Sequence, residues 1–227
     1  MLGQAAVSEE KHHDAAVGGT VTLPWIVGSA AVGALAGPPL RAGVLARYAV
    51  RPPPLAVEAA TAVLFGLLAA RVHPGLVLAA ACWLALCAVP LAFIDVAVRR
   101  LPDLLTGAAF AGTALLLLAA AAAGGHWPVL ARAVLGGLAL VGFYLVLVLV
   151  SPSGMGLGDV KAAAGLGTML AWQGWSALVV GGFAGFLLAA VYGIALLLSG
   201  RATRKQQMPF GPFMIAGAFL VVLAWPG

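Results

Sequence analysis

Long apolar stretches separated by short polar turns dominate the pattern of this chain. An α-helix needs about 20 apolar residues to cross the hydrocarbon core of a bilayer. Divided at that length, the pattern places helices near residues 23–46, 54–71, 75–95, 104–124, 129–150, 160–175, 176–199 and 209–226. The sequence therefore predicts an all-α polytopic membrane protein, a bundle of about eight transmembrane helices.

Residues 1–22 interrupt this pattern, because the segment carries charged side chains such as Glu9, Lys11 and Asp14. It lacks the basic-then-apolar order of a cleaved signal peptide. We therefore expect a polar, disordered extracytoplasmic tail over residues 1–22. A single membrane-embedded domain is expected over residues 23–227.

Composition agrees with the membrane assignment and limits the chemistry. Hydrophobic residues make up 63% of the 227 residues and charged residues only 8%, which excludes an ordinary water-soluble fold. Cys82 and Cys87 lie in an apolar stretch at a spacing that matches neither a zinc site nor a redox pair. We interpret both as packing residues. We predict no metal ion and no cofactor, and we expect no nucleic-acid partner.

The basic residues are divided unevenly between the two sides of the predicted bundle. By the positive-inside rule, the side with more of them faces the cytoplasm, where they also contact anionic lipid. Both termini are then expected outside, and Asp95, Asp103 and Asp159 reach the cytoplasmic boundary. The residues assigned to the cytoplasmic side are Arg41, Arg47, Arg51, Arg99, Arg100, Lys161, Arg201, Arg204 and Lys205, and those on the other side are Lys11, Arg71 and Arg132.

Small residues indicate close packing between helices. Gly181 and Gly185 form a small-residue pair of the kind that lets membrane helices approach each other. Such a pair suits packing within the bundle or a dimer face, and the sequence leaves both open.

A glycine-rich run, Gly154-Met155-Gly156-Leu157-Gly158-Asp159-Val160-Lys161, places an acid beside an apolar helix. A carboxylate within a membrane segment costs about 2.5–3.5 kcal/mol on insertion scales. The glycines indicate that backbone approaches this acid closely. A second acid, Asp95, closes the apolar stretch before it. Taken singly, an acid at a helix end is usually a helix cap or a solvated loop charge, but the pair on one side favours an aspartyl active site.

Two acids that meet can share one proton and cleave a peptide bond. The ionised partner activates a water molecule while the protonated partner polarises the carbonyl group, as in aspartic proteases. Asp159 at a helix start is stabilised in its ionised form by the helix dipole. The shared proton is therefore expected more often on Asp95.

The C-terminal stretch Met208-Pro209-Phe210-Gly211-Pro212-Phe213 carries a third signal. A residue that precedes proline is pushed towards extended geometry, so the start of the last helix is expected to be non-helical. An extended edge of this kind can pair with an unfolded substrate strand. A proline-rich helix start is the alternative interpretation.

Together these residues resemble the type IV prepilin peptidase family, bacterial membrane aspartic proteases of the GxGD type. Asp95, followed after six residues by Pro102-Asp103, is similar to the family's first acidic motif. Gly156-Leu157-Gly158-Asp159 with Lys161 is similar to the second motif, and Pro209-Phe210-Gly211-Pro212-Phe213 to the C-terminal signature. The resemblance spans roughly residues 55–227.

The resemblance implies an endopeptidase of the bacterial cytoplasmic membrane that cuts the basic leader from prepilins or pseudopilins at the cytoplasmic face. Asp95 and Asp159 become the catalytic pair, and Asp103 a supporting acid. The residues with supporting or substrate-binding roles are Gly156, Gly158, Lys161, Pro209, Phe210, Gly211 and Pro212. Asp103 and the catalytic pair are the only acids expected at this face.

One departure concerns the insert with two CxxC pairs that many family members carry. This chain has only a short stretch, about Arg47–Pro54, at the corresponding place. We therefore expect a short form that binds no zinc, and N-methyltransferase activity is not predicted. Two other functions use the same residues: a proton- or cation-coupled transporter that binds its ion at the acids, and a non-catalytic membrane assembly factor.

Overall fold

The computed structural model describes residues 23–151, 155–199 and 209–224. Every regular element in these residues is helical, which confirms the all-α prediction. The predicted tail, residues 1–22, lies outside the described residues, as do Arg201, Arg204 and Lys205.

The helices lie within a few residues of their predicted positions. In chain order they are an N-terminal helix (Leu23–Tyr48), α2 (Ala56–Arg71), α3 (Leu76–Val98), α4 (Asp103–Gly124), α5 (Trp127–Val150), α6 (Leu157–Gln173), α7 (Trp175–Leu198) and α8 (Gly211–Ala224).

Five of the helices in the described residues are long and apolar enough to cross a membrane: the N-terminal helix, α3, α4, α5 and α7. The chain is thus a polytopic membrane protein. The helices α2, α6 and α8 have only 16, 17 and 14 residues. The helix α6 is short because only a single residue, Gly174, separates it from α7, and α8 is short because it begins only after Pro209. The predicted number of helices is found, but not every helix has the length of a full span.

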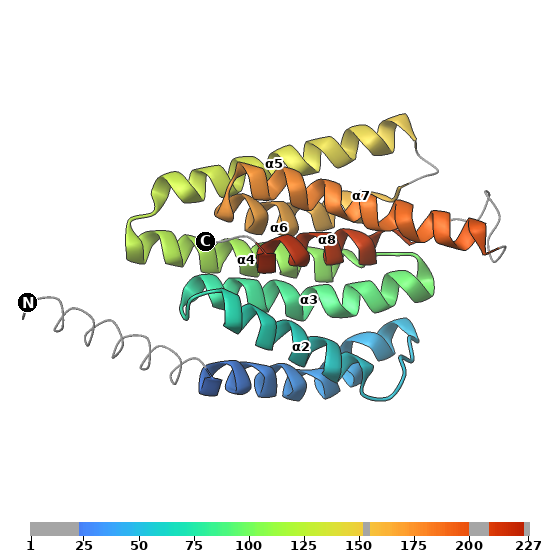
Figure 1. Cartoon of the computed structure of the whole chain (residues 1–227), viewed down its shortest axis with the longest axis horizontal. Helices are drawn as coiled ribbons and strands as arrows, with labels where there is room; N and C mark the ends of the chain where they lie inside the picture. The colour runs from blue at the N-terminus through green and yellow to red at the C-terminus, as the bar shows by residue number, and fades with distance from the viewer. Residues whose placement is uncertain (1–22, 152–154, 200–208, 225–227) are drawn as a thin grey trace, which may run out of the picture.

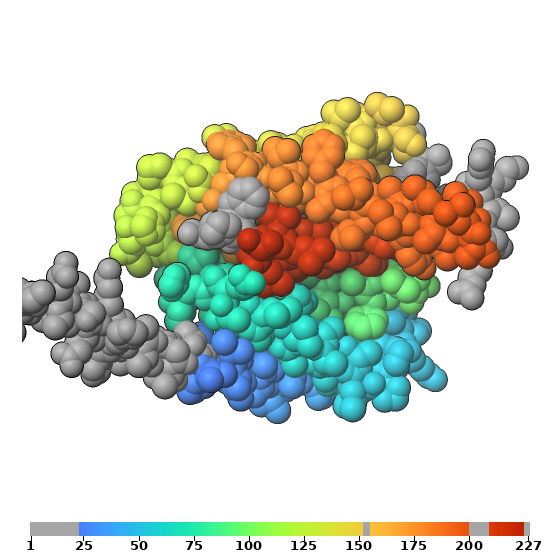
Figure 2. Space-filling view, in the orientation of Figure 1, coloured from blue at the N-terminus to red at the C-terminus, as the bar shows by residue number. Residues whose placement is uncertain are grey.

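The helices run roughly along one direction, with α5 and the N-terminal helix at opposite edges of the bundle (Figure 1). Between them, α6 contacts α4, α5, α7 and α8, while α3 contacts α2, α4 and α8. In the most apolar part of α3, 61% of the residues are buried inside the bundle. The corresponding share is 28% in each of α4, α5 and α7. On the face shown in Figure 2, α8 lies between α7 and the α2–α3 hairpin. The helices that carry the two predicted catalytic acids, α3 and α6, are therefore interior helices.

The outward surface of the bundle is apolar. Large hydrophobic side chains such as Leu104, Leu149 and Phe183 are 72%, 71% and 61% exposed. A water-soluble protein does not expose so much apolar surface, whereas lipid accepts it.

Glycines allow the interior helices to pack closely. A Cβ atom placed on Gly185 would lie 2.9 Å from the Cα atom of Met214 in α8, and one on Gly181 would lie 2.7 Å from the side chain of Leu170 in α6. Both glycines therefore pack within the bundle, which decides between the two interpretations of this pair.

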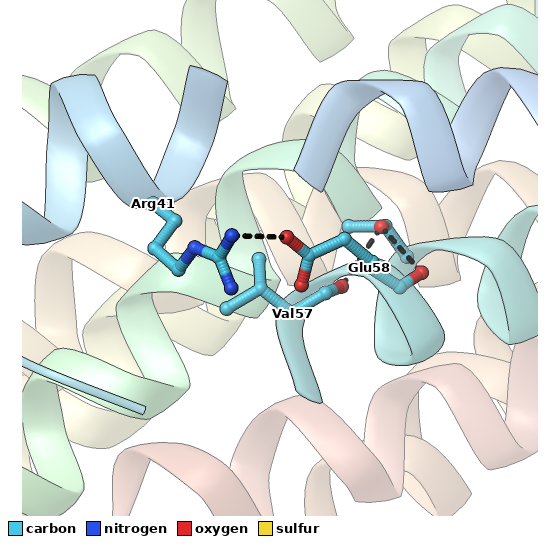
Figure 3. A network of polar contacts seen from close by, with 4 residues as sticks. Arg41, Val57 and Glu58 are labelled. Atoms are coloured by element: carbon cyan, nitrogen blue, oxygen red, sulfur yellow. Dashed lines mark hydrogen bonds and ion pairs between the residues drawn. The ribbon is translucent and has the colours of Figure 1, made fainter. Parts of the chain in front are cut away.

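The N-terminal helix is joined to α2 by polar contacts (Figure 3). Arg41 reaches across from the N-terminal helix, and its Nη2 atom lies 3.3 Å from Oε1 of Glu58. One turn along α2, the Thr61 hydroxyl donates a hydrogen bond of 2.6 Å to the carbonyl oxygen of Gly33. Arg41 lies in a short π-helical segment, Leu40–Val44.

Glu58 corrects one expectation. Its neighbour Val57 shares a cluster of buried residues with Ile94, which precedes Asp95, so Glu58 lies at the same end of the bundle as that acid. Asp103 and the catalytic pair are therefore not the only acids at this face. The position was overlooked because Glu58 stands alone in an apolar helix and gives no motif.

Candidate active site

Asp95 lies in the last turn of α3. The helix ends at Val98, and Arg99 then adopts a left-handed conformation with a φ of 53° while its N–H donates to the carbonyl oxygen of Asp95. The Asp95 side chain is buried and its Oδ2 atom accepts a hydrogen bond of 3.0 Å from the backbone N–H of Gly211. The first acidic motif is therefore held by the C-terminal signature, 116 positions away in the chain.

Asp159 lies in the first turn of α6, as its third residue. The helix begins at Leu157, slightly earlier than predicted, with Gly156 as its extended N-cap. The buried carboxylate turns back and accepts a hydrogen bond of 3.1 Å from the N–H of Gly156 on its Oδ2 atom. This contact satisfies one of the N–H groups that a helix start leaves unpaired. It also fixes the direction of the carboxylate.

Leu101 joins the two acidic motifs and the C-terminal signature. A Cβ atom on Gly211 would lie 2.8 Å from Oδ2 of Asp95 and 3.4 Å from Cδ2 of Leu101. A Cβ atom on Gly158 would lie 2.8 Å from Cβ of the same leucine. The structure thus brings Asp95, Asp159, Gly158 and Gly211 to one place, as predicted.

Asp103 and Lys161 lie at the edge of this place and pair with each other. Their Oδ1 and Nζ atoms are 2.7 Å apart, and their side chains are 75% and 51% exposed. An ion pair this exposed contributes little stability, about 0–1 kcal/mol. Asp103, the first residue of α4, is therefore separate from the buried acids, and its role as a supporting acid stays a prediction.

An aromatic cluster covers the site from the side of α5 and α7. The rings of Tyr144, Phe186 and Phe210 lie with centroids 4.8–5.9 Å apart. Phe210 belongs to the C-terminal signature, and it is partly buried like Pro209 and Pro212 beside it. Tyr144 is completely buried.

Sequence reasoning missed Leu101, Tyr144 and Phe186. Leu101 and Phe186 are apolar residues in a chain full of them, so no pattern distinguishes them. Tyr144 does carry a signal, because it is a phenol within the apolar second half of α5.

A separate apolar cavity of about 240 Å³ lies between α4, α5 and α6. Its walls include Phe110, Leu138 and Ala164, and none of the acids contributes to them. Within the described residues, no group of three or more His, Cys, Asp and Glu side chains is arranged to hold a metal ion. The cavity is therefore separate from the buried acids.

Comparison with known proteins agrees with the motifs. Residues 78–198, which contain both acids, match the type IV leader peptidase family. The chain belongs to this family, which confirms the resemblance.

Among curated relatives, the prepilin leader peptidase/N-methyltransferase of Aeromonas salmonicida (strain A449) is 36% identical over 191 residues, which cover 81% of this chain and 60% of the relative. The protein of the same name from Burkholderia pseudomallei (strain K96243) is 35% identical over 185 residues, covering 78% and 54%. The leader peptidase HopD of Escherichia coli is 37% identical over 99 residues, covering 40% and 61%. The chain thus spans about three fifths, or less, of the length of these relatives. No solved structure matches it significantly.

Proposed function

We propose that this protein is a membrane aspartic endopeptidase that removes leader peptides from prepilin-like proteins. One observation carries the proposal: Asp95 and Asp159, from two different helices, are both buried where Leu101, Gly158 and Gly211 meet, and each is oriented by a backbone N–H group. The donor to Asp95 comes from the C-terminal signature, so all three motifs contribute to one site. Membership of a leader peptidase family supports the same activity.

The geometry leaves one oxygen of each carboxyl group for chemistry. Both recorded hydrogen bonds engage Oδ2, and among the described residues Oδ1 of neither acid accepts one. In the proposed reaction the pair shares one proton. The ionised carboxylate takes a proton from a water molecule whose oxygen attacks the carbonyl carbon, and the other acid protonates the carbonyl oxygen. The C–N bond then breaks as the leaving nitrogen takes a proton from one acid, while a hydroxyl of the tetrahedral intermediate returns its proton to the other acid and re-forms the carbonyl group.

The proposed substrate is an extended segment followed by an apolar helix. An extended strand can lie along Pro209 and Phe210, which precede α8 and are not part of the helix. The apolar outer surface of the bundle leaves the following helix in lipid. The relatives' names give the substrate class, prepilins, by analogy.

The proposed location is the bacterial cytoplasmic membrane, with the site facing the cytoplasm. Arg99, Arg100 and Lys161 are exposed close to the two acids, as the positive-inside rule requires of a cytoplasmic end. Asp103 and Glu58 are the acids available there for a basic leader. A transporter gains no support, since both acids lie in terminal turns of their helices and not at mid-helix.

The test is leader removal by Asp95→Asn and Asp159→Asn variants, measured by product mass after co-expression with a prepilin from the same genome. Each substitution keeps the size of the side chain and removes its acid. We expect each to lower cleavage about a thousandfold or more while membrane insertion is unchanged.

Arg71→Gln, which removes an exposed charge at the far end of α2, is the control and should cleave normally. Full processing by either aspartate variant would defeat the proposal.

A further inference from the structure

Tyr144 is completely buried, and its hydroxyl has no hydrogen-bond partner among the described residues. Buried polar groups are nearly always paired, so an unpaired phenol calls for a reason such as a catalytic task or a bound water molecule. A phenylalanine would fill the same space without burying a polar atom.

The register of α5 against α6 directs Tyr144 towards the acids. A Cβ atom on Gly137 would lie 2.4 Å from the Thr168 hydroxyl, and one on Gly167 would lie 2.9 Å from Cβ of Leu140. The two helices are therefore antiparallel, and Tyr144, one turn beyond Leu140, lies against the first turns of α6. Asp159 is in the first of these turns.

Tyr144 also contacts the segment that holds the other acid. Its ring centroid lies 5.9 Å from that of Phe210, whose neighbour Gly211 donates to Asp95. On its other side the ring packs against Phe186 of α7 at 5.6 Å. The ring is thus fixed by packing between the segment that precedes α8 and α7.

We propose that Tyr144 is a positioning residue of the active site, whose hydroxyl donates a hydrogen bond, directly or through one water molecule, to the free oxygen of Asp159 in the working enzyme. This donor holds the carboxylate in its ionised form and aims it at the attacking water, and it leaves the shared proton of the pair on Asp95. The inference rests on the proposed peptidase activity and adds a third polar side chain to it.

The test is a Tyr144→Phe variant of the full chain in detergent or liposomes, with cleavage of a prepilin leader followed over a range of substrate concentrations. Loss of one positioned donor should lower kcat about 10-fold or more and leave KM within about twofold. The midpoint of thermal unfolding should be unchanged or higher, because the variant no longer buries an unpaired hydroxyl.

Tyr192→Phe is the matched control. Tyr192 also packs on a phenylalanine of the C-terminal signature, with its centroid 5.2 Å from that of Phe213, but it is 48% exposed. Removal of its hydroxyl should leave kcat, KM and stability unchanged.

Two results would overturn the inference. An unchanged kcat in Tyr144→Phe would show that the hydroxyl has no part in the reaction. If the unfolding temperature and the activity both fell, the hydroxyl would have a structural role instead. In both cases the peptidase proposal stands as long as Asp95→Asn and Asp159→Asn are inactive. Activity in either of these aspartate variants would defeat the peptidase proposal itself and the Tyr144 inference with it.

Discussion

Gly211 approaches Asp95 more closely than a residue with a side chain could. Its N–H donates to Oδ2, and a Cβ atom at this position would lie 2.8 Å from that same oxygen and 3.2 Å from Cγ. The need here is for space and not for an unusual backbone conformation, because Gly211 does not have a positive φ. Glycine at this position therefore serves the orientation of the acid.

A Gly211→Ala substitution should separate orientation from folding. The new methyl group meets the end of a flexible side chain, so the Asp95 carboxylate moves aside without disturbing the helices. We expect a loss of cleavage of about 10-fold or more, because small misplacements of catalytic groups are costly. The free energy of unfolding should change by less than about 1 kcal/mol.

Gly107→Ala is the matched control, since a Cβ atom there meets nothing within 4 Å and the residue lies in α4 close to the same end of the bundle. It should cleave normally and be more stable by about 0.5–1 kcal/mol. Normal cleavage by Gly211→Ala would show that the position of Asp95 tolerates movement.

Local spacing made part of the site predictable from sequence. Asp95 and Asp159 stand out because acids are rare in this apolar sequence, and Gly158 and Gly211 because they belong to the motifs beside them and at the C-terminal end; the structure brings these residues together. Their catalytic roles stay predictions. The ring of Tyr144 and the side chain of Leu101 contact residues that are far away in the sequence. Such contacts depend on how the helices pack, and the spacing of residues along the chain does not predict them.

Helix ends explain most of the small differences between prediction and structure. The apolar pattern places α6 near residue 160, but the helix starts at Leu157 because the Asp159 carboxylate caps the N–H of Gly156. α8 starts at Gly211, two residues later than predicted, because Pro212 fits the first turn of a helix while Pro209 precedes it. Hydrophobicity locates a helix, whereas capping and proline determine where it begins.

The pair formed by Arg41 and Glu58 holds the N-terminal helix against α2. Glu58 is buried and neither of its carboxylate oxygens has a hydrogen bond in the described residues, so its charge depends on Arg41 at 3.3 Å. Removing one partner of a buried ion pair is more harmful than replacing both, because an uncompensated charge remains.

Arg41→Leu should therefore lower the free energy of unfolding by about 1–3 kcal/mol, less than for a fully buried pair because the Arg41 side chain is 42% exposed. The double variant Arg41→Leu with Glu58→Leu should recover most of that loss. Both are measured by denaturant unfolding in detergent micelles. If the single variant is as stable as the parent chain, the pair does not hold these helices together.

The whole molecule has two chemically different ends. One carries Asp95, Asp103 and Asp159 with the exposed Arg99 and Arg100, and it includes the connections α3–α4 and α5–α6 (Figure 1). The other includes the α4–α5 turn, with exposed His126 and Trp127. Because basic residues gather beside the acids, we propose by the positive-inside rule that this end faces the cytoplasm.

This assignment predicts which end of the bundle a reagent outside the cell can reach. Cys82 and Cys87 are first replaced by alanine, and a single cysteine is then introduced by Arg100→Cys or by His126→Cys, both at exposed turns. In intact bacterial cells a membrane-impermeant maleimide should label the His126→Cys variant. It should label the Arg100→Cys variant only after the cells are permeabilised. The reverse pattern would place the acids on the outer face, and a peptidase that meets its substrates before they leave the cytoplasm could not work from there.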